Sequence, residues 1–201
     1  MKPRFAHTAA VTALLVFGGA QPAMAAPTVN TYAGTTAVSL SSALLDALSS
    51  LNVSVSRQFP ADLNGGTARF PIPTGQIDLG SAHGEIVHAG GLNLKAGATT
   101  VTLSDFVIDT TGPTPVLTGL VAANGDVVGR LPLFAITLTR NPVIRNFGVA
   151  GQVSISGASL ALTDAAAQAL NGAFGVTAFA QGIPVGTASV NAFTLNPAYI
   201  H

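Results

Sequence analysis

The chain has 201 residues, of which only 8% are charged, and it contains neither cysteine nor tryptophan. Eight basic residues balance eight acidic ones, so no basic surface is available to bind nucleic acid. The absence of cysteine excludes disulfides, thiol chemistry and cysteine-based metal sites.

The first 25 residues have the pattern of a secretory signal peptide. Lys2 and Arg4 precede a short apolar run, and Ala23-Met24-Ala25 places small residues where a signal peptidase cuts. We expect cleavage after Ala25, an exported protein in the periplasm or outside the cell, and one mature domain over residues 26–201. No later apolar stretch reaches the length of a membrane helix, and the scarcity of aromatic residues argues against a membrane β-barrel, so we do not expect a transmembrane protein.

Most of the mature chain alternates apolar and polar residues with a period of two, which is typical of half-buried β-strands. In TTVTLSDFVIDTTG, Val101 and Leu103 share one side with Phe106 and Ile108, after a small irregularity between the two pairs. The dipeptide Asn124-Gly125 predicts a hairpin with a type I′ turn, because both residues tolerate a positive φ. We expect an all-β domain, a β-sandwich or flattened barrel of about nine to eleven mostly antiparallel strands.

Two segments have a helical period instead. In SLSSALLDALSSLNVSV, Ser41 or Ser42 is the N-cap of a helix, and in LALTDAAAQALNGAFGV Thr163 caps a helix that Asn171-Gly172 ends. The leucines on the stripe of the first helix are Leu44, Leu45, Leu48 and Leu51. Each segment is a strand that runs into a short capped helix, which is either a weak internal repeat or only shared capping chemistry. We expect the two helices to close the ends of the β-domain.

The segment HGEIVH holds the densest group of potential metal ligands. On a strand, His83 and Glu85 share a face, whereas His88 points the other way unless a bulge intervenes, so the segment does not supply two histidines to one metal. The carboxylates are scattered, and the G-x-S-x-G, P-loop and G-x-G-x-x-G motifs are absent. We therefore expect no enzyme, no catalytic residue and no metal site.

The order of segments between Gly84 and Leu138 carries a resemblance. The run begins GEIVHAGGLNL and TTVTLSDFVIDTTG, closes with PVLTGLVAANGDVVGRLPLFAITL, and is followed by LALTDAAAQALNGAFGV and IPVGTASV. This succession resembles a family of small exported bacterial proteins of unknown role. More loosely, the middle portion is similar to the haem-transport-associated (HtaA-type) domain, over a minor part of the chain.

The second resemblance implies an exported β-sandwich with short helices that binds haem through a tyrosine supported by a histidine. His88 matches the histidine of the family motif, and Tyr32 lies where the family would place the tyrosine. A tyrosinate is a recognised axial ligand of haem iron, and a histidine that hydrogen-bonds the phenolate would stabilise it. The chain departs from the family pattern, since it lacks the tryptophan near the start of the domain and Ala89 follows His88.

The strand surface is rich in Thr, Ser and Asn and poor in charge, and no reactive centre is evident. We therefore expect a non-catalytic secreted or cell-envelope protein that acts through its surface in adhesion, matrix formation or assembly. Its partners would be cell-surface or matrix components or further copies of itself, and it would need no cofactor. The alternative is a binding protein for haem or another apolar small molecule, with Tyr32 and His88 as the haem-binding residues. A secreted hydrolase is the third possibility.

Overall fold

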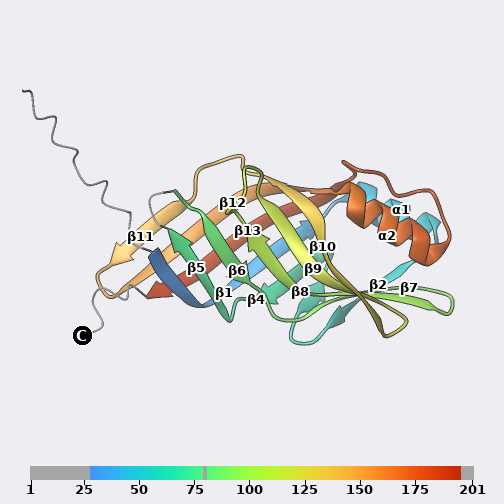
Figure 1. The fold of residues 1–201 in the computed structure, drawn as a ribbon, viewed down its shortest axis with the longest axis horizontal. Helices are drawn as coiled ribbons and strands as arrows, with labels where there is room; N and C mark the ends of the chain where they lie inside the picture. The colour runs from blue at the N-terminus through green and yellow to red at the C-terminus, as the bar shows by residue number, and fades with distance from the viewer. Residues whose placement is uncertain (1–27, 79–80, 196–201) are drawn as a thin grey trace, which may run out of the picture.

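A computed structural model describes residues 28–78 and 81–195. These residues form one antiparallel sheet of thirteen strands and two helices, which confirms the all-β prediction (Figure 1). The predicted signal peptide, residues 1–25, lies outside the described residues. Within the described ranges, no helix is both long enough and apolar enough to cross a membrane.

The structure has thirteen strands, more than the nine to eleven expected, because several short strands lie between the long ones. Helix α1 (Ser42–Ser50) follows β1, and helix α2 (Asp164–Phe174) follows β12. The strands are β1 (Thr28–Leu40), β2 (Ser54–Gln58), β3 (Asp62–Asn64), β4 (Thr67–Pro71), β5 (Thr74–Asp78), β6 (Gly84–Val87), β7 (Gly91–Ala96), β8 (Thr99–Asp109), β9 (Val116–Ala123), β10 (Asp126–Thr137), β11 (Val143–Phe147), β12 (Ala150–Leu162) and β13 (Pro184–Leu195).

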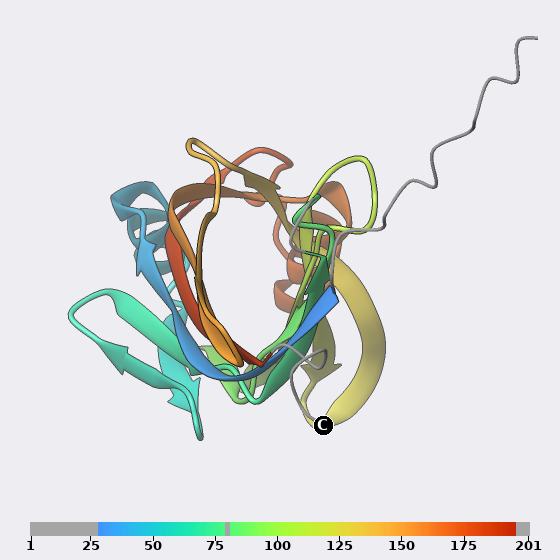
Figure 2. The ribbon, with the colours of Figure 1, turned by 90° about the vertical axis from the view of Figure 1, so that its left-hand side faces the viewer.

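Eight of the strands close on themselves as a barrel (Figure 2). Strand β13 pairs with both β1 and β12, and the ring continues from β12 through β10, β9, β8, β6 and β5 back to β1. The other strands extend this ring: β4 and β3 continue from β1, β7 and β2 from β8, and β11 from β12. Closure leaves few free strand edges and puts one face of each long strand inside.

The predicted irregularity in β8 is a β-bulge. Its pairing with β9 shifts register between Ser104 and Val107, and Asp105 has a φ of 49°. The extra residue reverses the alternation, so that Val101, Leu103, Phe106 and Ile108 are all buried while Asp105 is exposed. The predicted hairpin between β9 and β10 is confirmed as well, because Asn124 and Gly125 both have positive φ.

Both helices lie at one end of the barrel, so the expectation that they close its two ends is wrong (Figure 1). They begin at the expected caps, where the hydroxyls of Ser41 and Thr163 accept hydrogen bonds from the amides of Leu44 and Ala166, each 3.1 Å long. They meet at one end because β1 and β12 run on either side of β13, each antiparallel to it.

Helix α2 does not end at Asn171-Gly172 as predicted. It continues to Phe174 and ends at Gly175, whose left-handed conformation has a φ of 65°. Ala173 and Phe174 pack against the core, and this contact stabilises the last turn through Gly172.

Gly34 is required at a point of close approach between β1 and β13. Its φ is 149°, and a Cβ at this position would lie 2.3 Å from the carbonyl oxygen of Asn191. We predict that Gly34→Ala lowers the free energy of unfolding by at least about 2 kcal/mol, because the strand pair must separate to admit the methyl group. Chemical denaturation monitored by circular dichroism measures this change.

Gly172→Ala is the matched control for that substitution. Gly172 lies in α2 with open space around it, so alanine is expected to raise the free energy of unfolding by about 0.5–1 kcal/mol. Equal effects of the two substitutions would show that β1 and β13 do not need the close approach at Gly34.

Candidate functional site

His88 lies directly after β6, and its side chain is only 2% exposed. Ile86 is buried on the same side of the strand, whereas Glu85 is exposed on the other side, as the alternation predicted. The backbone amide of His88 donates to the carbonyl oxygen of Phe106 over 2.8 Å, so the residue continues the pairing of β6 with β8. The imidazole is therefore inside the protein.

Both ring nitrogens of His88 have protein partners. Nδ1 lies 3.3 Å from the carbonyl oxygen of Phe106, and Nε2 lies 2.7 Å from the hydroxyl oxygen of Thr36 on β1. Because a carbonyl oxygen only accepts, Nδ1 carries the proton and the Thr36 hydroxyl donates to Nε2. Burial lowers the pKa of His88 from 6.5 to about 4, against the opposing effect of the backbone hydrogen bonds. His88 is thus a neutral residue that joins β1 to β8.

Tyr32 lies on the outside, at a bulge in β1. It is the extra residue between the pairs Thr31–Thr194 and Ala33–Phe193, and its side chain is 48% exposed while that of Thr31 is 2% exposed. Phe193 is 44% exposed at the neighbouring position of β13, so the outer surface carries exposed aromatic residues on both strands near the bulge.

The structure does not bring Tyr32 and His88 together. The residue of β1 that meets the imidazole of His88 is Thr36, four positions further along the strand. The bulge at Tyr32 turns one part of β1 relative to the other, so that Thr31 and Thr36 both face inward and Tyr32 faces solvent. The alternation of apolar and polar residues in the sequence could not indicate that Tyr32 faces solvent, because a bulge depends on the pairing with the neighbouring strand.

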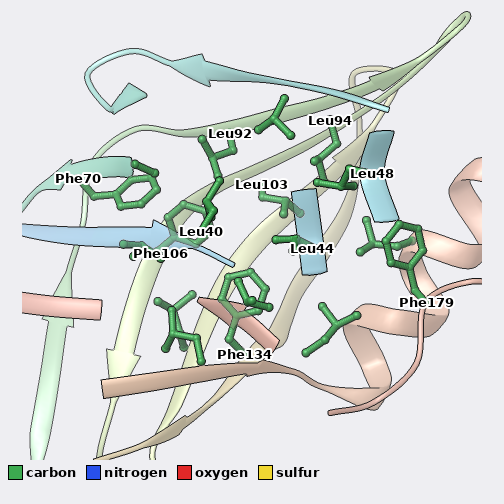
Figure 3. Close-up of a pocket in the computed structure, with 18 residues that line it drawn as sticks. Leu40, Leu44, Leu48, Phe70, Leu92, Leu94, Leu103, Phe106, Phe134 and Phe179 are labelled. Atoms are coloured by element: carbon green, nitrogen blue, oxygen red, sulfur yellow. The ribbon is translucent and has the colours of Figure 1, made fainter. Parts of the chain in front are cut away.

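The interior of the barrel contains an apolar cavity at the end covered by the helices (Figure 3). Its volume is about 70 Å³, and every residue that lines it is apolar. Leu44 and Leu48 of α1 and Phe179 after α2 cover it, while Phe70 and Phe106 lie on the strand side. The two phenyl rings meet edge to face, with centroids 5.1 Å apart and an interplanar angle of 78°.

A second cavity of about 50 Å³ lies further along the same interior, toward the end away from the helices. Ile77 of β5, Ile108 of β8 and Ile144 of β11 line it. Both cavities contact Val38, Leu117 and Leu160, so these three side chains separate one space from the other. The alternating pattern predicted that such residues face inward, but it could not indicate that they leave space between them.

Ionisable side chains do not converge on either cavity. Among residues 28–78 and 81–195, no three His, Asp or Glu side chains gather to hold a metal ion. Asp105 accepts a hydrogen bond from the hydroxyl of Ser104, and Asp109 is bonded to Thr111 on the surface. The side-chain and backbone hydrogen bonds from Thr111 lower the pKa of Asp109. Each of these two carboxylates is held by a neighbouring residue of its own strand or turn.

The buried imidazole predicts a loss of stability in mild acid. Because the pKa of His88 is lower in the folded protein than its ordinary value of 6.5, its contribution is complete above pH 6.5 and is lost as the pH falls toward 4. At about 1.4 kcal/mol for each pH unit, the free energy of unfolding falls by roughly 3 kcal/mol over this window. Denaturant titrations between pH 4 and pH 8 measure the change.

His88→Leu is expected to remove that pH dependence. The variant is less stable at pH 7, because the hydroxyl of Thr36 and the carbonyl of Phe106 lose a partner, but it lacks the group that takes up the proton. If the two proteins lose the same stability between pH 6.5 and pH 4, another group accounts for the acid sensitivity.

Comparison with known proteins rests on structure alone, because neither a family model nor a curated protein matches the sequence. The C-terminal domain of HtaA from Corynebacterium glutamicum has a TM-score of 0.63 and 15% identity, over 83% of this chain and 99% of that domain. The N-terminal domain of the same HtaA has a TM-score of 0.54 and 14% identity, over 84% of this chain and 97% of that domain. The heme binding protein HtaB of C. glutamicum has a TM-score of 0.50 and 16% identity, over 83% of this chain and 96% of that protein.

These likenesses correct the expected function. The prediction of a surface-acting adhesion, matrix or assembly protein is wrong, because the structural neighbours, among them the heme binding protein HtaB, favour the alternative, a binding protein for haem or another apolar small molecule. The prediction failed because a Thr- and Ser-rich strand surface does not distinguish a surface-acting protein from a ligand-binding barrel. The residues of a barrel site come from separate strands and need not form a motif in the sequence. The fold is that of the HtaA-type domain, which the chain resembles distantly.

Proposed function

We propose that this protein is a non-catalytic haem-binding protein of the HtaA-like type, exported by a bacterial cell. The observation that carries the proposal is the likeness of the entire barrel to HtaA and HtaB, which extends over 99% of the C-terminal domain of HtaA. In the resemblance drawn from the sequence, His88 matches the histidine of the family motif. The absence of a converging acid, base and nucleophile in the motif analysis supports a binding role.

The residues fit haem iron at one position. The phenol of Tyr32 is accessible on the outer surface, and a tyrosinate is a suitable ligand for the ferric iron that haem supplies as a Lewis acid. Phe193 beside it would pack against the porphyrin. The bulge in β1 is what turns Tyr32 outward, in agreement with the frequent use of bulges to direct a side chain toward a ligand.

The residues do not fit the tyrosine–histidine pair that the family resemblance implies. Nε2 of His88 is occupied by Thr36, and the ring is buried, so it cannot support the phenolate of Tyr32 directly. Its role in this proposal is to hold β1 in register with β8 through Thr36. Tyr32 is then the residue that would bind the iron, without a hydrogen bond from His88.

The spectrum of added haem tests this assignment. We expect the wild-type protein to shift the Soret band of haem, and Tyr32→Phe to weaken binding at least about tenfold and to lose the wild-type spectrum, because the ring remains and only the iron ligand is removed. Absorption titrations of haem with each protein at pH 7 measure both quantities.

Tyr32→His is the matched variant for that experiment. An imidazole at the same exposed position can bind iron, so haem is expected to remain bound with a spectrum different from that of the wild type. If neither variant alters the shift, Tyr32 is not the ligand, and if the wild-type protein produces no shift, the haem proposal fails.

Export by the predicted signal peptide is part of the proposal. We expect the protein isolated from its own host to begin at Ala26, and a chain with Ala23→Lys and Ala25→Lys to remain uncleaved, because the peptidase needs small residues at these positions. Intact-mass measurement of both proteins distinguishes the cleaved from the full-length chain. Recovery of wild-type protein with residues 1–25 still present contradicts export by this route.

A further inference from the structure

One row of residues crosses the outer face of the barrel from β1 to β11. It starts at the bulge that holds Tyr32 and continues to Phe193 of β13, which pairs with Ala33. Phe193 pairs in turn with Gln152 of β12, and Gln152 pairs with Arg145 of β11. Arg145 therefore lies three strands away from Tyr32, or about 14 Å at the usual strand spacing of about 4.8 Å.

The middle of this row faces outward. Phe193 is 44% exposed, whereas Ala192 and Thr194 on either side of it are 0% and 4% exposed. On β12, the side-chain amide of Gln152 donates to the amide oxygen of Asn191 on β13 over 2.6 Å, and this hydrogen bond is exposed. Because alternate side chains of a strand share a face, Phe193 and Asn191 are both on the outside of β13.

Arg145 faces the same outer side. Its neighbour Ile144 lines the second cavity and pairs with Val153, which is 2% exposed. Successive side chains of a strand point to opposite faces, so Arg145 points outward, and it is exposed. Val143 and Phe147, two positions before and after it, are 53% and 68% exposed. Arg145 is thus a cation between two exposed apolar residues of β11.

No carboxylate balances this cation. Strands β1, β11, β12 and β13 contain neither Asp nor Glu, and Arg145 is their one Lys or Arg residue. Among residues 28–78 and 81–195, no carboxylate lies within ion-pair distance of its guanidinium. The outer face on this side of Tyr32 is therefore apolar and uncharged except for one unpaired positive charge.

The strands on the other side of Tyr32 carry the opposite charge. Gln76 of β5 pairs with Asn30 of β1, and its side-chain amide donates to the amide oxygen of Asn30 over 3.3 Å. Gln76 also pairs with Glu85 of β6, which pairs directly with Asp109 of β8. Strands β5, β6 and β8 contain no Lys or Arg, and their acidic residues are Asp78, Glu85, Asp105 and Asp109. An anionic group is disfavoured on this side.

We propose that haem bound through Tyr32 lies over β13 and β12, with one propionate paired to the guanidinium of Arg145. This inference rests on the haem site proposed above and adds its orientation and a residue that selects for the propionates. Phe193 lies in the row between Tyr32 and Arg145, where it packs against the porphyrin. The half-width of a porphyrin, a propionate and an extended arginine side chain together span the three strands. The planar guanidinium matches the geometry of a carboxylate.

Absorption titrations with haem and with its dimethyl ester, in which both propionates are uncharged, test the orientation. Arg145→Glu is expected to weaken haem binding at least about tenfold, because it replaces an attraction for the propionate by a repulsion. Arg145→Gln is expected to weaken it about threefold, since an exposed ion pair contributes little. Neither variant is expected to change the affinity for the dimethyl ester or the Soret position of bound haem, because Tyr32 is intact. Equal losses for haem and its ester overturn the pairing with a propionate.

Arg57→Glu is the matched control for net charge. Arg57 is exposed on β2, which pairs with β7 and lies outside the row from Tyr32 to Arg145. The substitution changes the net charge as Arg145→Glu does, but salt screens a charge at a distance, so haem affinity is expected to stay within about twofold of the wild type. Arg145→Lys keeps the charge and is expected to retain most of the affinity. Equal losses in Arg57→Glu and Arg145→Glu overturn a local role of Arg145.

Glu85→Gln tests the opposite orientation. If the propionates lay over β5 and β6, removal of the Glu85 carboxylate would strengthen haem binding, because a like charge is removed. With the propionate at Arg145, the affinity of Glu85→Gln is expected to stay within about twofold of the wild type. A clear gain in Glu85→Gln, without a loss in Arg145→Glu, overturns the proposed orientation.

The failure of this inference is distinguishable from the failure of the haem proposal. Haem binding that depends on Tyr32 but is equally tight in Arg145→Glu and Arg57→Glu overturns the orientation and leaves the haem site intact. A wild-type protein that does not shift the Soret band overturns both. Unchanged circular dichroism and unchanged affinity for the dimethyl ester show that Arg145→Glu is folded, as expected for an exposed position.

Discussion

The pairing of β13 with both β1 and β12 is the interaction on which this structure depends. It connects the first strand of the described chain to the last, closes the ring, and converts the alternating pattern of every long strand into an inside and an outside. It also brings the two helices to one end, because each helix follows a strand that flanks β13. The close approach at Gly34 is one demanding point of this closure, since no side chain fits there.

The hydrogen bond between Thr36 and His88 shows that the folded protein gives the motif histidine a different partner from the one expected from the sequence. In a sequence that resembles the HtaA-type domain, His88 reads as a partner for an iron-binding tyrosine. In the folded protein its imidazole is neutral, buried and bonded to Thr36 and Phe106. Tyr32 is exposed on the outer face, and Phe193 is exposed at the neighbouring position of β13. The barrel fold is shared with HtaA and HtaB.

Several features were predictable because they depend on neighbours in the chain. The caps Ser41 and Thr163, the turn at Asn124-Gly125 and the inward side of β8 follow from local conformational preference and from burial with a period of two. Other features were not predictable in this way. The bulge at Tyr32, the end of α2 at Gly175 and the position of both helices depend on pairing and packing with distant segments.

By itself, the sequence determined the all-β class, the antiparallel hairpins, the two capped helices and the residues that face inward, because hydrophobic periodicity and turn chemistry are local properties. Only the tertiary structure decided that the strands close into a barrel, that His88 meets Thr36 in place of Tyr32, and that the inward residues leave two apolar spaces with Val38, Leu117 and Leu160 between them. The physical reason is that barrel closure, bulge placement and incomplete packing are set by contacts between residues far apart in the chain. The alternation of residues along one strand does not indicate which strand it pairs with.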